Sequence, residues 1–148
     1  MNGKAPYRKP APYRKSGFFN NKVLNPLLAA LRLAPSLTIR GRATGRKYTM
    51  PVLPLEYEGR RYLVAPRGNT NWARNLRAVG EGDLRLHGRK IHFQATEIPT
   101  SQRPPLVAAY VQQHGKKYGG FVAKEFELMP DPADHPVFLL IESRPAKS

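Results

Sequence analysis

Short apolar segments separated by glycine and proline turns constrain the fold of this chain more than any other feature. Segments of this kind, rich in β-branched and aromatic residues, are typical of strands joined by tight turns. They occupy residues 36–40, 47–55, 60–65, 83–98 and 136–143. The segment 83–98 is predicted to form two strands around the turn at His87 and Gly88. Because proline cannot donate to a strand ladder, Pro51 and Pro54 place their strand near a sheet edge or at a bulge. We therefore expect about six mostly antiparallel strands.

Three segments have helical patterns. The first begins at Asn25 and Pro26, a typical N-cap and first helical residue, and ends at Pro35. Its leucines recur at helical spacing, which indicates a core-facing stripe or, alternatively, a helix lying on a membrane surface. The other two predicted helices span residues 71–80, with a glycine C-cap, and 104–113. About three helices accompany the strands.

Strands and helices in these proportions favour an α+β protein, a small antiparallel barrel with helices packed outside it. The glycine-rich stretch 114–121 predicts a break after the third helix. At 148 residues the chain is large enough to bury one core, and it has no cysteine for disulfides or thiolate metal sites. No apolar run approaches the roughly 20 residues of a membrane span, and no signal peptide is evident. We expect a soluble, cytoplasmic protein.

Positive charge is concentrated in the first part of the chain. Residues 1–90 hold 19 Lys and Arg against four acids, whereas residues 91–148 hold six of each sign. This asymmetry indicates an anionic partner: nucleic acid, an anionic membrane, or a phosphorylated or carboxylated ligand. The basic segment 1–17 repeats APYRK and predicts a disordered tail before a single domain at 18–148. The tail is either a solubilising arm or an anchor to lipid or nucleic acid.

The link at residues 41–47, Gly-Arg-Ala-Thr-Gly-Arg-Lys, is a candidate anion site between two predicted strands. Gly41 and Gly45 would let the backbone turn sharply and present N–H groups to an anion. Arg42 and Arg46 offer planar guanidinium groups that suit phosphate. The alternative is an exposed basic hairpin without a ligand.

A second candidate link follows the strand that ends near residue 65. It carries Arg67 and Gly68 into the N-terminus of the 71–80 helix, where free N–H groups favour negative charge. Trp72 is predicted to be either a core anchor or a stacking residue. Two such links could line opposite sides of one phosphate-bearing ligand.

No familiar catalytic set is present. The four histidines are scattered without metal-ligand spacing, and there is no Gly-x-Ser-x-Gly elbow. If the protein is an enzyme, a bound cofactor is expected to supply the chemistry.

The pairing of Gly-Arg-x-Thr-Gly with Asn-Trp-x-x-Asn-Leu at this separation resembles the deazaflavin-dependent nitroreductase family. These are flavin and deazaflavin oxidoreductases related to the FMN-binding split-barrel proteins, and the similarity runs from about Leu24 to Ile141. It implies a split β-barrel, often a homodimer. It also implies an enzyme that passes a hydride from reduced coenzyme F-420 to a quinone, nitroaromatic or enone.

The same resemblance implies roles for particular residues. The residues it places against the cofactor are Gly41, Arg42, Thr44, Gly45, Arg67, Gly68, Asn69, Asn71, Trp72 and Asn75. Arg46 and Lys47, the other cations of the first link, complete the predicted cofactor-binding set. Tyr110 and Tyr118 fall in the region where the family places tyrosines near the substrate, and they are the predicted catalytic residues.

Two positions depart from the family pattern: Ala43 and Tyr48 stand where basic residues are usual. Arg46 lies two residues before Tyr48, so in a strand it would face the same side and could substitute. If it does not, FMN, haem or a fatty acid becomes the alternative ligand. A carrier of such a ligand, and a non-catalytic basic binder of nucleic acid or membrane, are the competing functions.

Overall fold

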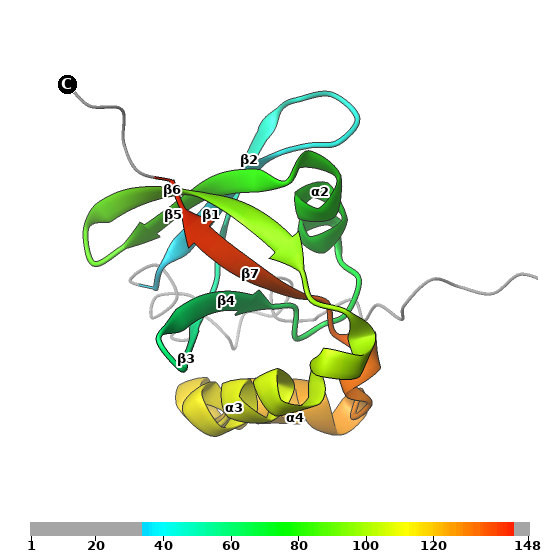
Figure 1. Ribbon diagram of the computed structural model, residues 1–148. Helices are drawn as coiled ribbons and strands as arrows, with labels where there is room; N and C mark the ends of the chain where they lie inside the picture. The colour runs from blue at the N-terminus through cyan, green and yellow to red at the C-terminus, as the bar shows by residue number, and fades with distance from the viewer. Residues whose placement is uncertain (1–33, 144–148) are drawn as a thin grey trace, which may run out of the picture.

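A single curled antiparallel sheet forms the centre of the molecule. The computed structural model describes residues 34–143, and Figure 1 shows the sheet with α2 on one side and the α3–α4 pair beneath it. The strand order is β2-β1-β5-β6-β7-β4-β3, and every pairing is antiparallel. The strands are β1 (Ser36–Arg40), β2 (Lys47–Pro51), β3 (Leu55–Tyr57), β4 (Arg60–Val64), β5 (Glu81–Leu86), β6 (Arg89–Glu97) and β7 (Val137–Glu142). The predicted α+β class is confirmed.

The helices cover two parts of the sheet. They are α2 (Asn71–Val79), α3 (Pro104–His114) and α4 (Lys117–Leu128), with short 3-10 turns η3 (Thr100–Gln102) and η4 (Pro132–Asp134). The predicted helices 71–80 and 104–113 are confirmed. The basic tail and the helix predicted after Asn25 lie outside the described residues. Within residues 34–143, no helix has the length and apolar character needed to cross a membrane.

Two details of the strand and helix prediction are wrong. The segment 47–55 is not one strand, because β2 ends at Pro51 and β3 begins at Leu55 after Pro54 has interrupted the ladder. The predicted break at 114–121 is too long, because α4 is assigned from Lys117. A break is present at Gly119 and Gly120, whose φ values of 69° and 84° are left-handed and interrupt the regular helix. Val122 and Phe126, at helical spacing after these glycines, are both buried.

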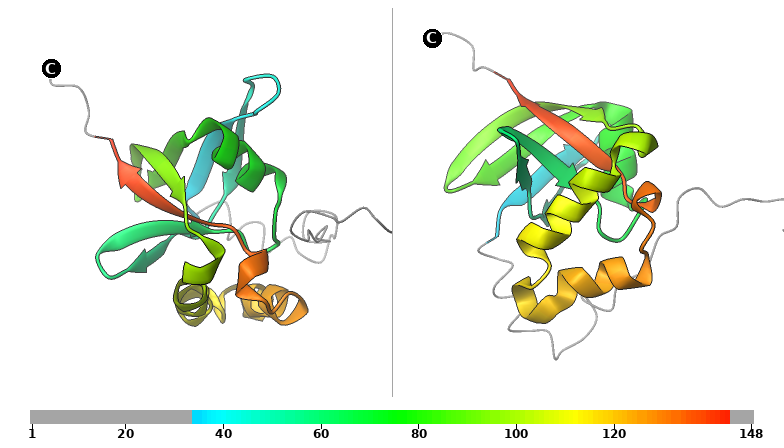
Figure 2. Two further views of the ribbon diagram at one scale, coloured as in Figure 1. Left: turned by 45° about the vertical axis from the view of Figure 1, so that its right-hand side comes forward. Right: turned by 60° about the horizontal axis from the view of Figure 1, so that its bottom comes forward.

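Apolar side chains form two clusters, one on each side of the β4–β7 region. The first lies between the sheet and α2 and includes Leu37, Leu76 and Phe138. The second lies between the sheet and the α3–α4 pair, whose helices diverge from their connection in the right-hand view of Figure 2, and includes Tyr110 and Phe126. This division matters for function because the candidate site lies beside the first cluster, not the second.

His92 lies between two carboxylates on the outer face of the sheet. Its Nδ1 is 2.8 Å from an oxygen of Asp83, and its Nε2 is 3.0 Å from an oxygen of Glu81. The hydrogen bond with Asp83, and then that with Glu81, raise the pKa of His92 above its ordinary value of 6.5. The charged imidazole therefore stabilises the fold fully below a pH of about 6.5, and the contribution is lost as the pH rises through the folded-state pKa.

We expect His92→Gln to lower the free energy of unfolding at about pH 6 and to have little effect at about pH 9. Urea unfolding at both pH values measures this difference. His87→Gln, in the exposed turn between β5 and β6, is the matched control and should show no such pH dependence. An equal loss for His92→Gln at both pH values would contradict the assignment.

Candidate functional site

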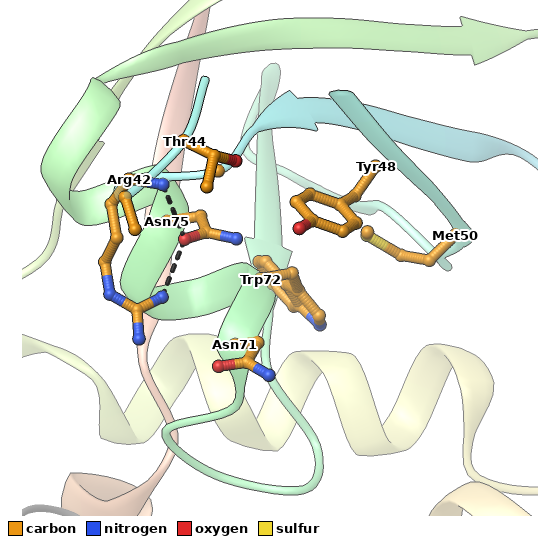
Figure 3. A pocket seen from close by; sticks show the side chains of 9 residues that line it. Arg42, Thr44, Tyr48, Met50, Asn71, Trp72 and Asn75 are labelled. Atoms are coloured by element: carbon orange, nitrogen blue, oxygen red, sulfur yellow. Dashed lines mark hydrogen bonds between the residues drawn. The ribbon is translucent and has the colours of Figure 1, made fainter. Parts of the chain in front are cut away.

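A cavity of about 310 Å³ lies between the first hairpin and α2. Figure 3 shows the side chains that line it. The lining residues are Gly41, Arg42, Ala43, Thr44, Tyr48, Met50, Asn71, Trp72 and Asn75. The two links that the sequence singled out thus meet at one cavity, one contributing from the loop at residues 41–46 (the basic loop) and the other from α2.

The basic loop is held by its own backbone. The N–H of Gly41 donates to the Arg46 carbonyl at 2.7 Å, and the N–H of Gly45 donates to the Gly41 carbonyl at 3.0 Å. Gly45 has a φ of 78°, a conformation that favours glycine. The glycines therefore make the sharp turn as expected. The expectation that they present N–H groups to an anion is wrong, because the loop itself uses both.

Asn75 fastens the basic loop to α2. Its Oδ1 accepts from the backbone N–H of Arg42 at 3.0 Å and from Nη1 of the same residue at 2.7 Å. The Asn75 side chain comes from α2 and is buried. Within the described residues, the Nε and Nη2 groups of Arg42 have no partner, so its guanidinium can still hold an anion.

Aromatic side chains form the opposite end of the cavity. Trp72 packs on the core through Phe138, with ring centroids 6.2 Å apart, and also lines the cavity. It is therefore a core anchor, one of the alternatives predicted for it, and its place in the cavity lining leaves stacking on a ligand as a prediction. Tyr48 enters from β2, and its ring lies so close to Gly41 that a Cβ there would be 2.8 Å from Cε2. Met50 completes this wall.

The second link contributes less than predicted. Asn71, the first residue of α2, lines the cavity, whereas Arg67, Gly68 and Asn69 do not. Asn69 instead accepts a hydrogen bond from Nη1 of Arg77 at 3.1 Å.

Strand alternation separates Lys47 from the cavity. Successive residues of β2 point to opposite faces, so Tyr48 and Met50 face the cavity while Lys47 lines a hollow on the outer face. Arg46 is exposed on the basic loop and does not line the cavity either. Alternation along β2 was the signal by which Tyr48 and Met50 could have been identified as lining residues.

The two predicted catalytic tyrosines are not brought to this cavity by anything the structure describes. Tyr110 is 2 % exposed and belongs to the second apolar cluster. Its ring packs against His114 and Phe126, at centroid distances of 5.0 and 5.7 Å. Tyr118 lies on α4, and its side chain is outside the described part of the structure. Among residues 34–143, no group of His, Asp and Glu side chains is arranged to hold a metal ion.

Known structures share this architecture at low sequence identity. An F-420H2-dependent reductase (FDR-A) is 19 % identical, with a TM-score of 0.53 over 72 % of this chain and 92 % of that one. The haem storage protein HutZ from Vibrio cholerae is 14 % identical, with a TM-score of 0.52 over 82 % and 92 %. A chain described as a domain-swapped dimer is 17 % identical, with a TM-score of 0.54 over 72 % and 78 %. These similarities show the split-barrel fold.

The sequence itself identifies the family. Residues 23–125, which include the basic loop, α2 and most of the sheet, match the family of F-420H2-dependent quinone reductases. A search of curated proteins finds no match to this chain. The resemblance drawn from the Gly-Arg-x-Thr-Gly and Asn-Trp-x-x-Asn-Leu segments is confirmed. The chain belongs to the F-420H2-dependent quinone reductase family, and it is a deazaflavin-dependent reductase whose cofactor is coenzyme F-420.

Proposed function

We propose that this protein transfers a hydride from reduced coenzyme F-420 to a quinone, with nitroaromatics and enones as further acceptors of the same reaction class. The observation that carries the proposal is the cavity, where an indole, a phenol and a guanidinium line one space. A flat ring suits the aromatic end, and an anionic tail suits the end that carries Arg42.

The residues present fit the coenzyme in two parts. At about 310 Å³, the cavity lies at the small end of ligand pockets, which usually span about 300–1,000 Å³. This volume holds a ring system but not the whole coenzyme. The phosphate and glutamate tail would therefore lie outside the cavity, over the basic loop. There Arg42 and Thr44 would hold the phosphate, with Arg46 exposed beside them for a carboxylate. When bound, the coenzyme supplies the hydride.

The chain supplies the position of the reactants. Asn75 fixes Arg42 in the orientation that an anion would meet. Trp72, supported by Phe138, gives one rigid wall, and Tyr48 gives another. Fixed groups of this kind accelerate a reaction by holding the reactants in contact, which contributes several kcal/mol to the barrier decrease, on the order of 7–11 at best.

The single tryptophan makes the proposal directly testable. Because Trp72 is the chain's one tryptophan and lines the cavity, its fluorescence reports on ligands that enter it. We expect saturable quenching by coenzyme F-420 and weaker quenching by FMN titrated in parallel. Quenching by FMN alone would mean that the cavity binds a cofactor but that the cofactor is FMN. Quenching by neither would mean that the cavity is not the cofactor site.

We expect Arg42→Ala to weaken coenzyme F-420 binding by about tenfold to a hundredfold. A hydrogen bond to a charged group contributes about 1.5–3 kcal/mol, and about 1.4 kcal/mol corresponds to tenfold in affinity. The matched control is Arg85→Ala, which removes an equal charge from the exposed outer face of β5. Equal weakening in both variants would mean that net charge, not the basic loop, attracts the coenzyme.

A homodimer, implied by the family resemblance, stays a proposal that the molar mass in solution tests. Contact with a membrane through the tail and first helix concerns residues outside the described part.

A further inference from the structure

Three of the residues that line the cavity, Asn71, Trp72 and Asn75, come from α2. The beginning of this helix lacks the contacts that usually fix a helix start. Its N-cap Thr70 makes no side-chain capping hydrogen bond among the described residues, and the first turn holds no acidic residue. A helix of nine residues is too short to be stable by itself. Its position must therefore depend on contacts with the rest of the chain.

Arg77 makes such contacts from the second half of α2. Its Nε and Nη2 donate to the two carboxylate oxygens of Glu97, at 2.6 and 2.8 Å, and its Nη1 donates to Oδ1 of Asn69 at 3.1 Å. Glu97 is the last residue of β6, and Asn69 lies eight positions before Arg77, in the loop that leads from β4 into α2. One guanidinium therefore joins the helix, its entry loop and the sheet.

The carboxylate that anchors Arg77 is itself held in place. Oε2 of Glu97 also accepts from Nη2 of Arg103 at 3.0 Å, and the Arg103 side chain is nearly buried and donates to backbone carbonyls. The hydrogen bond with Arg77 lowers the pKa of Glu97 below its ordinary value of 4.5, and the same bond raises the pKa of Arg77. Both groups are therefore charged at neutral pH, and Arg77 has a fixed partner on the sheet.

We propose that Arg77 and Asn69 are positioning residues of the coenzyme site. Anchored on Glu97, Arg77 holds Asn69 and thereby fixes the entry of α2 and the places of Asn71 and Trp72, which follow in the chain. This proposal rests on the proposed function, and it gives Asn69 a role other than contact with the cofactor. Neither positioning residue belongs to the described lining of the cavity. A wall that is already in place spares the coenzyme the cost of ordering it.

The position of α2 can be tested without the coenzyme. Acrylamide quenching of Trp72, the chain's one tryptophan, measures how freely the indole is reached. We expect Arg77→Met and Asn69→Ala each to raise the quenching constant by about 1.5-fold or more, because a loosened helix start opens more often. The control is Arg61→Met, which removes an ion pair with Glu56 of the same 2.6 Å length, on β4 and outside the cavity lining. It should leave the constant unchanged.

Coenzyme titration tests the consequence for binding. Arg77→Met should weaken coenzyme F-420 binding about three- to tenfold, the cost of ordering one or two side chains. Arg77→Lys keeps the charge but loses the paired bonds to Glu97, so it should also weaken binding by about threefold or more. Arg61→Met, with the same loss of charge as Arg77→Met, should not. Because Asn69 acts through Arg77, the double variant Asn69→Ala with Arg77→Met should bind as Arg77→Met alone does.

Each result decides the assignment. Unchanged quenching and unchanged coenzyme affinity in both Arg77→Met and Asn69→Ala would overturn it. Additive losses of affinity in the double variant would mean that Asn69 touches the coenzyme directly, which would also overturn it. Asn69→Ala keeps the ion pair intact, so it supplies the test if Arg77→Met does not fold. If the wild-type protein fails to bind the coenzyme while quenching rises in the variants, the proposed function fails and the role of Arg77 in fixing α2 stands.

Discussion

Replacing Arg103 with methionine is expected to lower the free energy of unfolding by about 3–5 kcal/mol. The guanidinium is nearly buried, with 8 % of the side chain exposed. It donates to the carbonyl of Ile98 at 2.9 Å, to that of Ala133 at 3.0 Å, and to a carboxylate oxygen of Glu97 at 3.0 Å. These bonds join the end of β6 to η4 where α3 begins. Methionine would fill the space but leave the carbonyl oxygens without a donor, which is the costly part of the change.

The control is the same substitution at an exposed position. Arg89 lies 3.9 Å from Glu142, with 72 % of its side chain exposed, so Arg89→Met should change stability by no more than about 0.5 kcal/mol. Urea unfolding followed by circular dichroism measures both variants. A loss below about 1 kcal/mol for Arg103→Met would show that water replaces the guanidinium, and that the junction does not depend on it.

The positions of most strands along the sequence could be predicted because strands carry local signals. Glycine turns at residues 58–59 and 87–88 and alternating apolar residues locate β4, β5 and β6 closely. The prediction failed where tertiary packing outweighs local preference. Gly119 and Gly120 do interrupt the regular helix, with φ values of 69° and 84°, yet α4 is assigned on both sides of them because Val122 and Phe126 pack on the core beside α3.

The site could be predicted in outline only. The basic loop and α2 each carry a recognisable pattern, but the contact between Arg42 and Asn75 joins residues 33 positions apart. No local pattern specifies which donors an amide oxygen will meet. The burial of Tyr110 is likewise a property of the α3–α4 pair, since a tyrosine on a helix gives no sign of which layer it faces.

The contact between Arg42 and Asn75 carries the largest expected effect on binding. Asn75→Leu preserves side-chain volume but removes the acceptor for two Arg42 donors. We expect coenzyme F-420 affinity to fall about tenfold to a hundredfold, as for Arg42→Ala, since Arg42 is released and its part-buried N–H is left unpaired. The free energy of unfolding should fall by about 1–3 kcal/mol. Trp72 fluorescence and urea unfolding measure the two effects separately.

The matched control for this change is Gln113→Leu. Gln113 also joins a helix to a strand through two hydrogen bonds of its side-chain amide. It accepts from the backbone N–H of Glu56 at 3.2 Å and donates to the Glu56 carbonyl at 3.1 Å. It lies on α3, remote from the cavity lining. We expect a smaller loss of stability, because these bonds are exposed, and unchanged coenzyme affinity. If Asn75→Leu weakened coenzyme binding no more than Gln113→Leu does, the basic loop would not need its link to α2 in order to bind the coenzyme. The coenzyme would then be held by groups other than Arg42.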